Sequence, residues 1–108
     1  MTILLDENVH RKLRFRFPGH DVVTVTDMGW SGKRNGELMK LMLDAKFDLL
    51  ITLDKGLEHQ QNFTKYPIPI LLLEVKGSQY EFLVPLIDKI KSLLSATLPA
   101  GVTRVSPD

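Results

Sequence analysis

The chain has 108 residues, of which 44% are hydrophobic and 25% are charged, and its formal net charge at pH 7 is +1. This size and composition predict one compact domain over residues 1–108, whose core needs no disulfide and no structural metal. The lack of cysteine excludes zinc–thiolate sites, iron–sulfur clusters, thiol nucleophiles and a disulfide-rich secreted scaffold. Because such a chain suits a reducing compartment, we expect a cytoplasmic protein.

The apolar stretches of the sequence are short. The longest, IPILLLEV at residues 68–75, is too short to span a bilayer, and no basic segment precedes the apolar run at the N-terminus. We therefore expect a soluble protein that has no membrane partner. The net charge is too small to attract nucleic acid by itself, so any electrostatic attraction must be local.

In the first half of the chain, the spacing of apolar residues predicts two strands and two helices. TILLD at residues 2–6 predicts a strand, and residues 9–17 follow as a short helix. The inward face of this helix is expected to hold three residues at spacings of four: Val9, Leu13 and Phe17. Residues 21–27 predict a second strand, and residues 28–34 a loop. Residues 35–47 predict a helix with five inward side chains: Leu38, Met39, Leu41, Met42 and Ala45.

The second half of the chain continues this alternation. Residues 48–54, DLLITLD, are nearly all apolar, which suits a parallel strand that is covered on both faces. We expect a short polar helix next, then a strand over residues 68–75, an amphipathic helix over residues 81–97 and a last strand over residues 101–106. The alternation predicts an open, mostly parallel α/β sandwich with right-handed crossovers.

Acidic residues follow two of the predicted strands. Ligands of open α/β sheets bind at the carboxyl ends of the strands, beside the point where the strand order reverses. Asp6 and Glu7 follow the first strand and Asp54 ends the third, so their carboxylates converge if these strands are neighbours. Glu37 lies in the first turn of the helix after the second strand. Oxygen ligands suit Mg²⁺ or Mn²⁺, and a bound ion would relieve the repulsion between clustered acids.

The same acids also have a purely structural interpretation. Aspartate is a favoured N-cap where a strand leads into a helix, and Asn35 is the expected N-cap of its own helix. Glu37, in a first helical turn, complements the helix dipole. For each acid taken alone, capping and chemistry both remain open, whereas three acids at one edge favour a site.

Basic residues gather in one segment of the chain. Between His10 and His20 the sequence has no acid and four basic residues: Arg11, Lys12, Arg14 and Arg16. Because this segment starts just after Asp6, its side chains are expected near the acidic pocket, where they would contact the phosphates of a nucleic acid. The alternative is a solvated helix face without a ligand.

The remaining candidates are weaker. The three histidines, His10, His20 and His59, do not have the spacing of zinc ligands. The sequence also has no glycine-rich phosphate loop of the familiar kinds and no nucleophile elbow. Trp30 suits either a stacking contact with a base or a half-buried anchor in its loop.

Three blocks of the sequence resemble the small PIN-like proteins of bacteria. These blocks are ILLDEN at residues 3–8, DMGWSGKRNGELMKLM at residues 27–42 and FDLLITLDKGLEHQQN at residues 47–62. The resembled family consists of single compact domains related to the PIN nucleases, and many members are assigned as toxins of toxin–antitoxin pairs. The likeness extends from about Ile3 to Val105. It implies a three-layer α/β/α sandwich of about five strands and a metal-dependent ribonuclease that uses Mg²⁺ or Mn²⁺.

The resemblance also implies roles for particular residues. Asp6, Glu37 and Asp54 match the catalytic and metal-binding acids of the family. Arg11, Lys12 and Arg14 would then bind the RNA. The accessory candidates are Glu7, Asn8, Lys55, Glu58 and Gln61. Many relatives have a further acid two residues after the position of Asp54, where this chain has Gly56.

The departure at Gly56 leaves several interpretations open. Glu58 could replace the missing acid from the next turn, or Gln60, Gln61 and Asn62 could offer neutral oxygens or hold the substrate. The gap leaves open a site with one metal ion, a weak enzyme or a protein that has lost the activity. The favoured function is an endoribonuclease that has a cognate antitoxin protein as its partner. Whether the protein also forms a homo-oligomer stays open. The alternatives are a PIN-like module that binds RNA or protein without cutting, and a receiver-like domain phosphorylated on Asp54. The receiver hypothesis ranks lower because receivers need a hydroxyl residue at the end of the fourth strand and a lysine at the end of the fifth. The segments at these places, LLLEV and VTRVS, supply neither cleanly.

Overall fold

The computed structural model describes residues 1–57 and 65–107, which form an α/β fold around one five-stranded sheet. The strands are β1 (Thr2–Leu5), β2 (Asp21–Thr24), β3 (Leu49–Thr52), β4 (Pro69–Leu73) and β5 (Gly101–Val105). They lie in the order β2-β1-β3-β4-β5, and every neighbouring pair is parallel. The prediction of an α/β fold with a mostly parallel sheet is confirmed.

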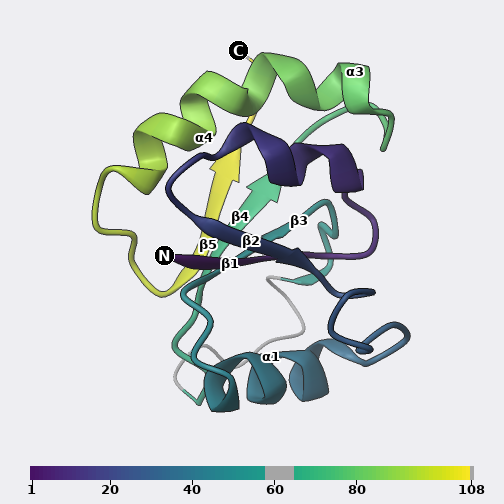
Figure 1. Ribbon diagram of the computed structural model, residues 1–108, viewed down its shortest axis with the longest axis vertical. Coiled ribbons are helices and arrows are strands. Elements are labelled where there is room, and N and C mark those ends of the chain that lie inside the picture. Colours follow the sequence, from purple (N-terminus) through teal and green to yellow (C-terminus); the bar gives the residue numbers. More distant parts are fainter. Residues whose placement is uncertain (58–64, 108) are drawn as a thin grey trace.

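Helical segments cover both faces of the sheet. They are the 3₁₀ helix η1 (Arg11–Arg16), α1 (Asn35–Asp44), α3 (Tyr80–Leu83), the 3₁₀ turn η2 (Val84–Leu86) and α4 (Ile87–Leu94). Helix α1 lies on one side of the sheet, whereas η1, α3 and α4 lie on the other (Figure 1). The described residues therefore form three layers. None of the helices among them is both long enough and apolar enough to cross a membrane.

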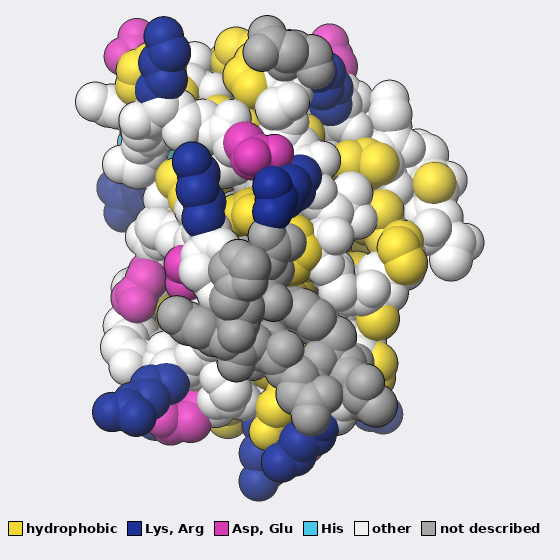
Figure 2. Space-filling view, turned by 180° about the vertical axis from the view of Figure 1, so that it is seen from behind, with side chains coloured by type: hydrophobic (Ala, Val, Ile, Leu, Met, Phe, Trp, Pro, Cys, Tyr) yellow, Lys and Arg dark blue, Asp and Glu magenta, His cyan; other side chains and the backbone are white. Residues whose placement is uncertain are grey.

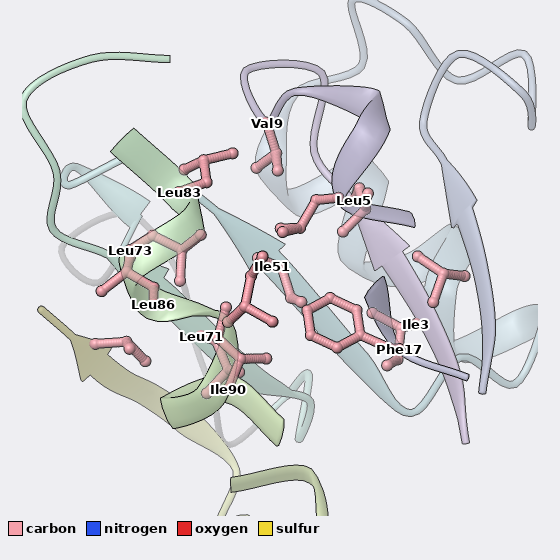
Figure 3. Close-up of a cluster of buried hydrophobic side chains, with 14 of the residues drawn as sticks. Ile3, Leu5, Val9, Phe17, Ile51, Leu71, Leu73, Leu83, Leu86 and Ile90 are labelled. Carbon is pink, nitrogen blue, oxygen red and sulfur yellow. The ribbon is translucent and has the colours of Figure 1, made fainter. Parts of the chain in front are cut away.

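Two hydrophobic clusters hold these layers together. Alternate residues of β1 face opposite sides, so Ile3 and Leu5 join one cluster and Leu4 the other. On the first side, Leu83, Leu86 and Ile90 pack against Ile51 and Leu71 of the sheet (Figure 3). All four residues of β3 are buried, which explains its continuous apolar sequence.

The pairing of β1 with β3 is fixed at its amino end by a side chain. The Asp48 carboxylate accepts a hydrogen bond of 2.7 Å from the Thr2 backbone N–H, while the Asp48 N–H donates to the Thr2 carbonyl at 2.8 Å. The pair then runs in register from Ile3 opposite Leu49 to Leu5 opposite Ile51. This register determines which residues meet at the carboxyl edge.

The first predicted helix is a 3₁₀ helix. Its predicted inward residues Val9, Leu13 and Phe17 are all buried. The regular helix covers only Arg11–Arg16, because the His10 side chain caps it by accepting a hydrogen bond of 3.2 Å from the Lys12 N–H. The predicted face was therefore right, whereas the predicted length was too long.

Helix α1 confirms the second predicted helix and corrects its ends. Asn35 is its first helical residue and not its N-cap, which is Arg34. The helix ends in a Schellman motif, in which the Phe47 N–H bonds to the Met42 carbonyl and Lys46 adopts a left-handed φ of 61°. Because the chain leaves the helix at this point, the prediction that Ala45 faces inward is wrong, and Ala45 is exposed.

The inward face of α1 is otherwise as expected. Leu38, Met39 and Met42 are buried, and Leu41 is half-buried.

The predicted helix over residues 81–97 is divided into α3, η2 and α4. Pro85 lies within η2, where it has no backbone N–H to continue an α-helical ladder. The helical segments also end earlier than predicted, at Leu94. The short polar helix expected after Asp54 falls mainly on residues 58–64, which lie outside the described part of the chain.

The central strand should be sensitive to loss of volume. Ile51 is fully buried in β3, so Ile51→Ala removes apolar contacts and leaves a cavity. We expect the free energy of unfolding, measured by urea titration, to fall by about 2–5 kcal/mol. Leu43→Ala is the matched control, because Leu43 is 37% exposed on α1, and it should change stability by only about 0.5 kcal/mol. Equal effects of the two changes would contradict the assigned core.

Candidate functional site

The strand order places a switch point between β1 and β3. From β1 the chain passes through η1 to β2 at one edge, and then returns through α1 on the opposite face to β3 on the other side of β1. The condition on which the convergence of the acids depended, that the first and third strands are neighbours, is met. The residues that follow β1 and β3 therefore meet at the carboxyl edge, where open α/β sheets bind their ligands.

Asp6 follows β1 and is fixed through its backbone N–H and both oxygens of its carboxylate. Its N–H continues the sheet by donating to the Ile51 carbonyl at 2.9 Å. Its Oδ1 accepts from the Glu7 N–H at 2.9 Å, and its Oδ2 accepts from the hydroxyl of Thr52 at 2.7 Å. The Asp6 carboxylate is thus held against the end of β3.

The Thr52 hydroxyl connects the two predicted acids. Thr52 is fully buried, and its Oγ1 donates to Asp6 while it accepts from the Asp54 N–H at 3.0 Å. One hydroxyl therefore joins the chain after β1 to the chain after β3. Thr52 was not among the predicted site residues, although it is the one polar residue in the apolar run LLITL of residues 49–53.

Asp54 stabilises the turn that follows β3. Its Oδ1 accepts a hydrogen bond of 2.9 Å from the Gly56 N–H, and its backbone carbonyl accepts one of 3.2 Å from Leu57. Its Oδ2 accepts from the side-chain amide of Asn35 at 3.3 Å, which ties the start of α1 to the end of β3. Asp54 therefore has a structural role in this turn. The helix that it was expected to cap lies mainly outside the described residues, so its capping role and a chemical role both stay predictions.

Burial raises the pKa of Asp6. The hydrogen bonds from Thr52 and from the Glu7 N–H act in the opposite direction and lower it, whereas the nearby charges of Glu7 and Asp54 raise it further. Asp6 is therefore a carboxyl group whose ionised form is disfavoured by its surroundings. A cation bound at this edge would favour the ionised form.

Glu37 is placed differently from Asp6 and Asp54. It lies in the first turn of α1 and is exposed, whereas Asn35, two residues earlier, makes the contact with Asp54. Among the side chains of residues 1–57 and 65–107, no group of three or more His, Asp or Glu is arranged to hold a metal ion. The Thr52 hydroxyl thus contacts the Asp6 carboxylate and the Asp54 N–H, whereas Glu37 forms no part of this arrangement. A place for Glu37 in the site stays a prediction.

A cavity of about 590 Å³ opens beside Asp6. Its walls include the acids Asp6 and Glu7 and the basic residues Arg11 and Arg14. The predicted proximity of the acidic and basic segments is therefore confirmed for these residues. Neither Asp54 nor Glu37 is part of the cavity wall, although both are described residues.

The accessory candidates Glu7 and Asn8 hold the surroundings of the cavity. The Asn8 side-chain oxygen accepts a hydrogen bond of 3.1 Å from the Leu53 N–H, which is a second connection between the ends of β1 and β3. The Glu7 Oε1 accepts from the Gly32 N–H at 3.4 Å, which brings the loop of residues 28–34 to the site. Both residues line the cavity.

Arg14 is held in place by an ion pair. Its guanidinium lies 2.9 Å from the Asp27 carboxylate, which accepts a hydrogen bond of 3.1 Å from the Thr24 N–H, while the Asp27 N–H donates to the Thr24 hydroxyl at 3.0 Å. Hydrogen bonding from the Thr24 N–H above all, together with the Thr24 side chain and the charge of Arg14, lowers the pKa of Asp27. Asp27 was not predicted as part of the site, because its role depends on a turn that brings it back to β2.

The other candidates lie away from this cavity or outside the described residues. Lys55 lines a second cavity of about 690 Å³, together with Glu74, Lys76 and Glu81. Trp30 is the half-buried anchor of its loop, since its ring meets the Phe47 ring edge-on at 5.7 Å between centroids. Glu58 and Gln61 lie outside the described residues.

Comparisons of the chain with protein-family models, with curated proteins and with solved structures found no match. The description of the candidate site therefore depends on the geometry of this chain alone.

The raised pKa of Asp6 predicts a pH-dependent cost in stability. Because the pKa of Asp6 in the folded protein lies above its ordinary value of 3.8, the folded state binds the proton more tightly than the unfolded chain. The free energy of unfolding of the wild type, relative to Asp6→Asn, should therefore fall as the pH rises from about 3.8 through the folded pKa, and then level off. Urea titrations of both proteins across this range measure the difference.

The variant Thr52→Val provides the control for this prediction. It removes the hydroxyl that lowers the pKa of Asp6, so the folded pKa should rise further, as observed by NMR titration of the Asp6 carboxyl carbon. A pH-independent difference between wild type and Asp6→Asn would contradict a raised pKa.

Proposed function

We propose that the chain is a PIN-like, metal-dependent endoribonuclease that hydrolyses RNA phosphodiester bonds with Mg²⁺ or Mn²⁺. The observation that carries the proposal is the Thr52 hydroxyl, which holds the ends of β1 and β3 together so that Asp6 and Asp54 lie at one edge. The proposal includes the resemblance to bacterial toxins of toxin–antitoxin pairs. A cognate antitoxin and a cytoplasmic location belong to the same proposal.

The two carboxylates fit a hard divalent cation. Mg²⁺ is usually held in proteins by one or two carboxylates, with waters and substrate phosphates completing its coordination. Asp6 and Asp54 supply this number, and the charge of Asp54 contributes to the raised pKa of Asp6, which a cation would reverse. A bound Mg²⁺ or Mn²⁺ supplies an activated water and neutralises charge on the scissile phosphate and the leaving oxygen.

The chain itself positions the carboxylates and the substrate. Thr52 and the Glu7 N–H orient the oxygens of Asp6, while Asn35 and the Gly56 N–H orient those of Asp54. In the cavity that Asp6 and Glu7 also line, Arg11 and Arg14 can meet the phosphates on either side of the scissile bond. An acidic centre with a basic flank is the charge distribution that a phosphodiester substrate requires.

A non-catalytic binding module is the second candidate function. Both carboxylate oxygens of Asp54 already accept hydrogen bonds, from Gly56 and from Asn35, so the residue has a structural role without any metal. A module of this kind would keep the basic flank and bind RNA without cutting it. A cleavage assay distinguishes the two functions.

Asp54→Asn tests the proposed mechanism with little disturbance of the fold. The asparagine side-chain oxygen can still accept from the Gly56 N–H, so the turn is kept while the negative charge is removed. We expect Mg²⁺- or Mn²⁺-dependent cleavage of a labelled RNA to fall by about 100-fold or more, because loss of a group that only supports a metal ligand already costs about 10- to 100-fold and Asp54 is proposed to hold the ion itself. Product formation is measured with and without chelator.

Two further variants control this test. Asp44→Asn removes an exposed acid from the last turn of α1 and should leave cleavage unchanged. Glu58→Gln should cost less than Asp54→Asn, because Asp54 lies two residues after the end of β3 and is tied to that strand by the Thr52 hydroxyl. Cleavage that resists chelator, or full activity of a folded Asp54→Asn variant, would rule the mechanism out, and binding without any cleavage would favour the second candidate.

The basic segment should contribute affinity that depends on salt. Each phosphate contact to single-stranded RNA releases counterions and adds about 0.7 to the magnitude of the slope of log K against log salt. Arg11→Ala should reduce the slope by about this amount. Arg14→Ala should reduce it less, because Asp27 already neutralises Arg14 at 2.9 Å.

Binding of a labelled single-stranded RNA at several salt concentrations measures these slopes. Lys40→Ala, on the exposed side of α1, is the control and should leave the slope unchanged. If Arg11→Ala also leaves it unchanged, the basic segment is a solvated helix face.

A further inference from the structure

Phe15 is the most exposed large hydrophobic residue among those described. Its exposed fraction is 77%, whereas the others lie between 36% and 42%. It belongs to η1, whose buried residue Leu13 packs into the core with the neighbouring Val9 and Phe17. Leu13, Val9 and Phe17 therefore attach this segment to the core, and the Phe15 ring contributes little to it.

The geometry of η1 places this ring beside the cavity. In a 3₁₀ helix, side chains three residues apart lie in one row. Arg11 and Arg14 form the row that lines the cavity, and Lys12 and Phe15 form the adjacent row. The Arg14 guanidinium carbon lies 5.7 Å from the centre of the Phe15 ring, so the ring borders a residue of the cavity wall.

The surroundings of Phe15 are fixed and positively charged. Arg14 is held by its ion pair with Asp27, and Arg16 by a hydrogen bond of 2.7 Å to the Tyr80 hydroxyl. On the face seen in Figure 2, Lys and Arg side chains are interspersed with Asp and Glu, whereas η1 carries four basic residues and no acid. An exposed aromatic ring within a basic segment suits a ligand that has both flat apolar groups and negative charge.

We propose that Phe15 is a stacking residue that receives an unpaired base of the RNA, at the rim of the cavity lined by Arg11 and Arg14. This inference rests on the proposed function and deepens it by naming the element that distinguishes single-stranded from double-stranded RNA. The base lies on the free face of the ring while Arg11 and Lys12 contact the adjoining phosphates. Every base has a π-face, so this contact tolerates different sequences.

A paired base does not fit this role. Within a duplex both faces of each base are covered by neighbouring bases, so a ring on the protein surface has no face to stack on. A protein partner is the other ligand that an exposed aromatic residue can serve, but it would have to bring acidic groups to η1. The position of the ring, 5.7 Å from the guanidinium carbon of Arg14 in the cavity wall, favours the RNA.

The test measures binding in the presence of chelator, so that cleavage plays no part. Labelled single-stranded RNA is titrated with wild type, Phe15→Ala and Phe15→Trp. Phe15→Ala should weaken binding about 5- to 150-fold, the range that corresponds to loss of one base–aromatic stack. Its salt slope should stay that of the wild type, because no charge is removed. Phe15→Trp should retain the affinity of the wild type, and Leu43→Ala should change nothing.

Oligonucleotides with altered bases complete the test. On an abasic oligonucleotide, which keeps the phosphates, and on double-stranded RNA, wild type and Phe15→Ala should bind equally. Equal binding of the two proteins to intact single strands, or no binding by the wild type, would overturn the proposal. In the first case the ring would be assigned to a protein contact. Because cleavage is not measured, an inactive protein that shows the stacking effect would contradict the proposed nuclease and leave this inference standing.

Discussion

The parallel pairing of β1 with β3 is the constraint on which the site depends. These strands are separated by more than 40 residues of sequence, and the chain builds β2 and α1 before it returns to pair them. Because the side chains of a strand alternate between faces, a slip of one residue would move Ile3 and Leu5 out of their cluster and replace them with Leu4. Packing of the two clusters therefore fixes the register. That register in turn places Asp6 beside Thr52.

The site combines two electrostatic environments within a short distance. Among the residues that line the cavity, Asp6 is half-buried near other acids, and its hydrogen bonds offset only part of the cost of ionisation. In the same lining the charge of Arg14 is balanced by Asp27, while Arg11 remains exposed to solvent. Under the proposed function, a metal ion would be bound beside Asp6 and the phosphates of the substrate beside Arg11.

The sequence predicted the sheet better than it predicted the helices. The run of buried apolar residues in β3 and the acids after β1 and β3 are local patterns, so the parallel sheet and the shared edge of Asp6 and Asp54 follow from them. Pro85 is also visible in the sequence, but whether it kinks or divides a helix depends on packing. The Schellman motif that leaves Ala45 exposed requires a left-handed Lys46, which its residue type does not indicate.

The contacts that organise the site were harder to predict. Thr52 stands in an apolar strand, and its sequence does not reveal that Asp6 will lie within 2.7 Å of its hydroxyl. Asn35 was expected to cap its own helix and instead bonds to Asp54, because the distance between α1 and the end of β3 is set by tertiary packing. Phe15 does not share the spacing of Val9, Leu13 and Phe17, and this mismatch was the available sign that it faces solvent.

Helix α1 is connected to β3 at both of its ends, through the turn at Lys46 and through the Asn35–Asp54 hydrogen bond. The ten residues of α1 span about 15 Å and the four of β3 about 13 Å, so the helix brings its first residue back to the carboxyl edge. One residue inserted into α1 would turn Asn35 by about 100° around the helix axis and away from Asp54. Insertions and deletions between β2 and β3 are therefore restricted to the loop of residues 25–34, where added length leaves this connection intact.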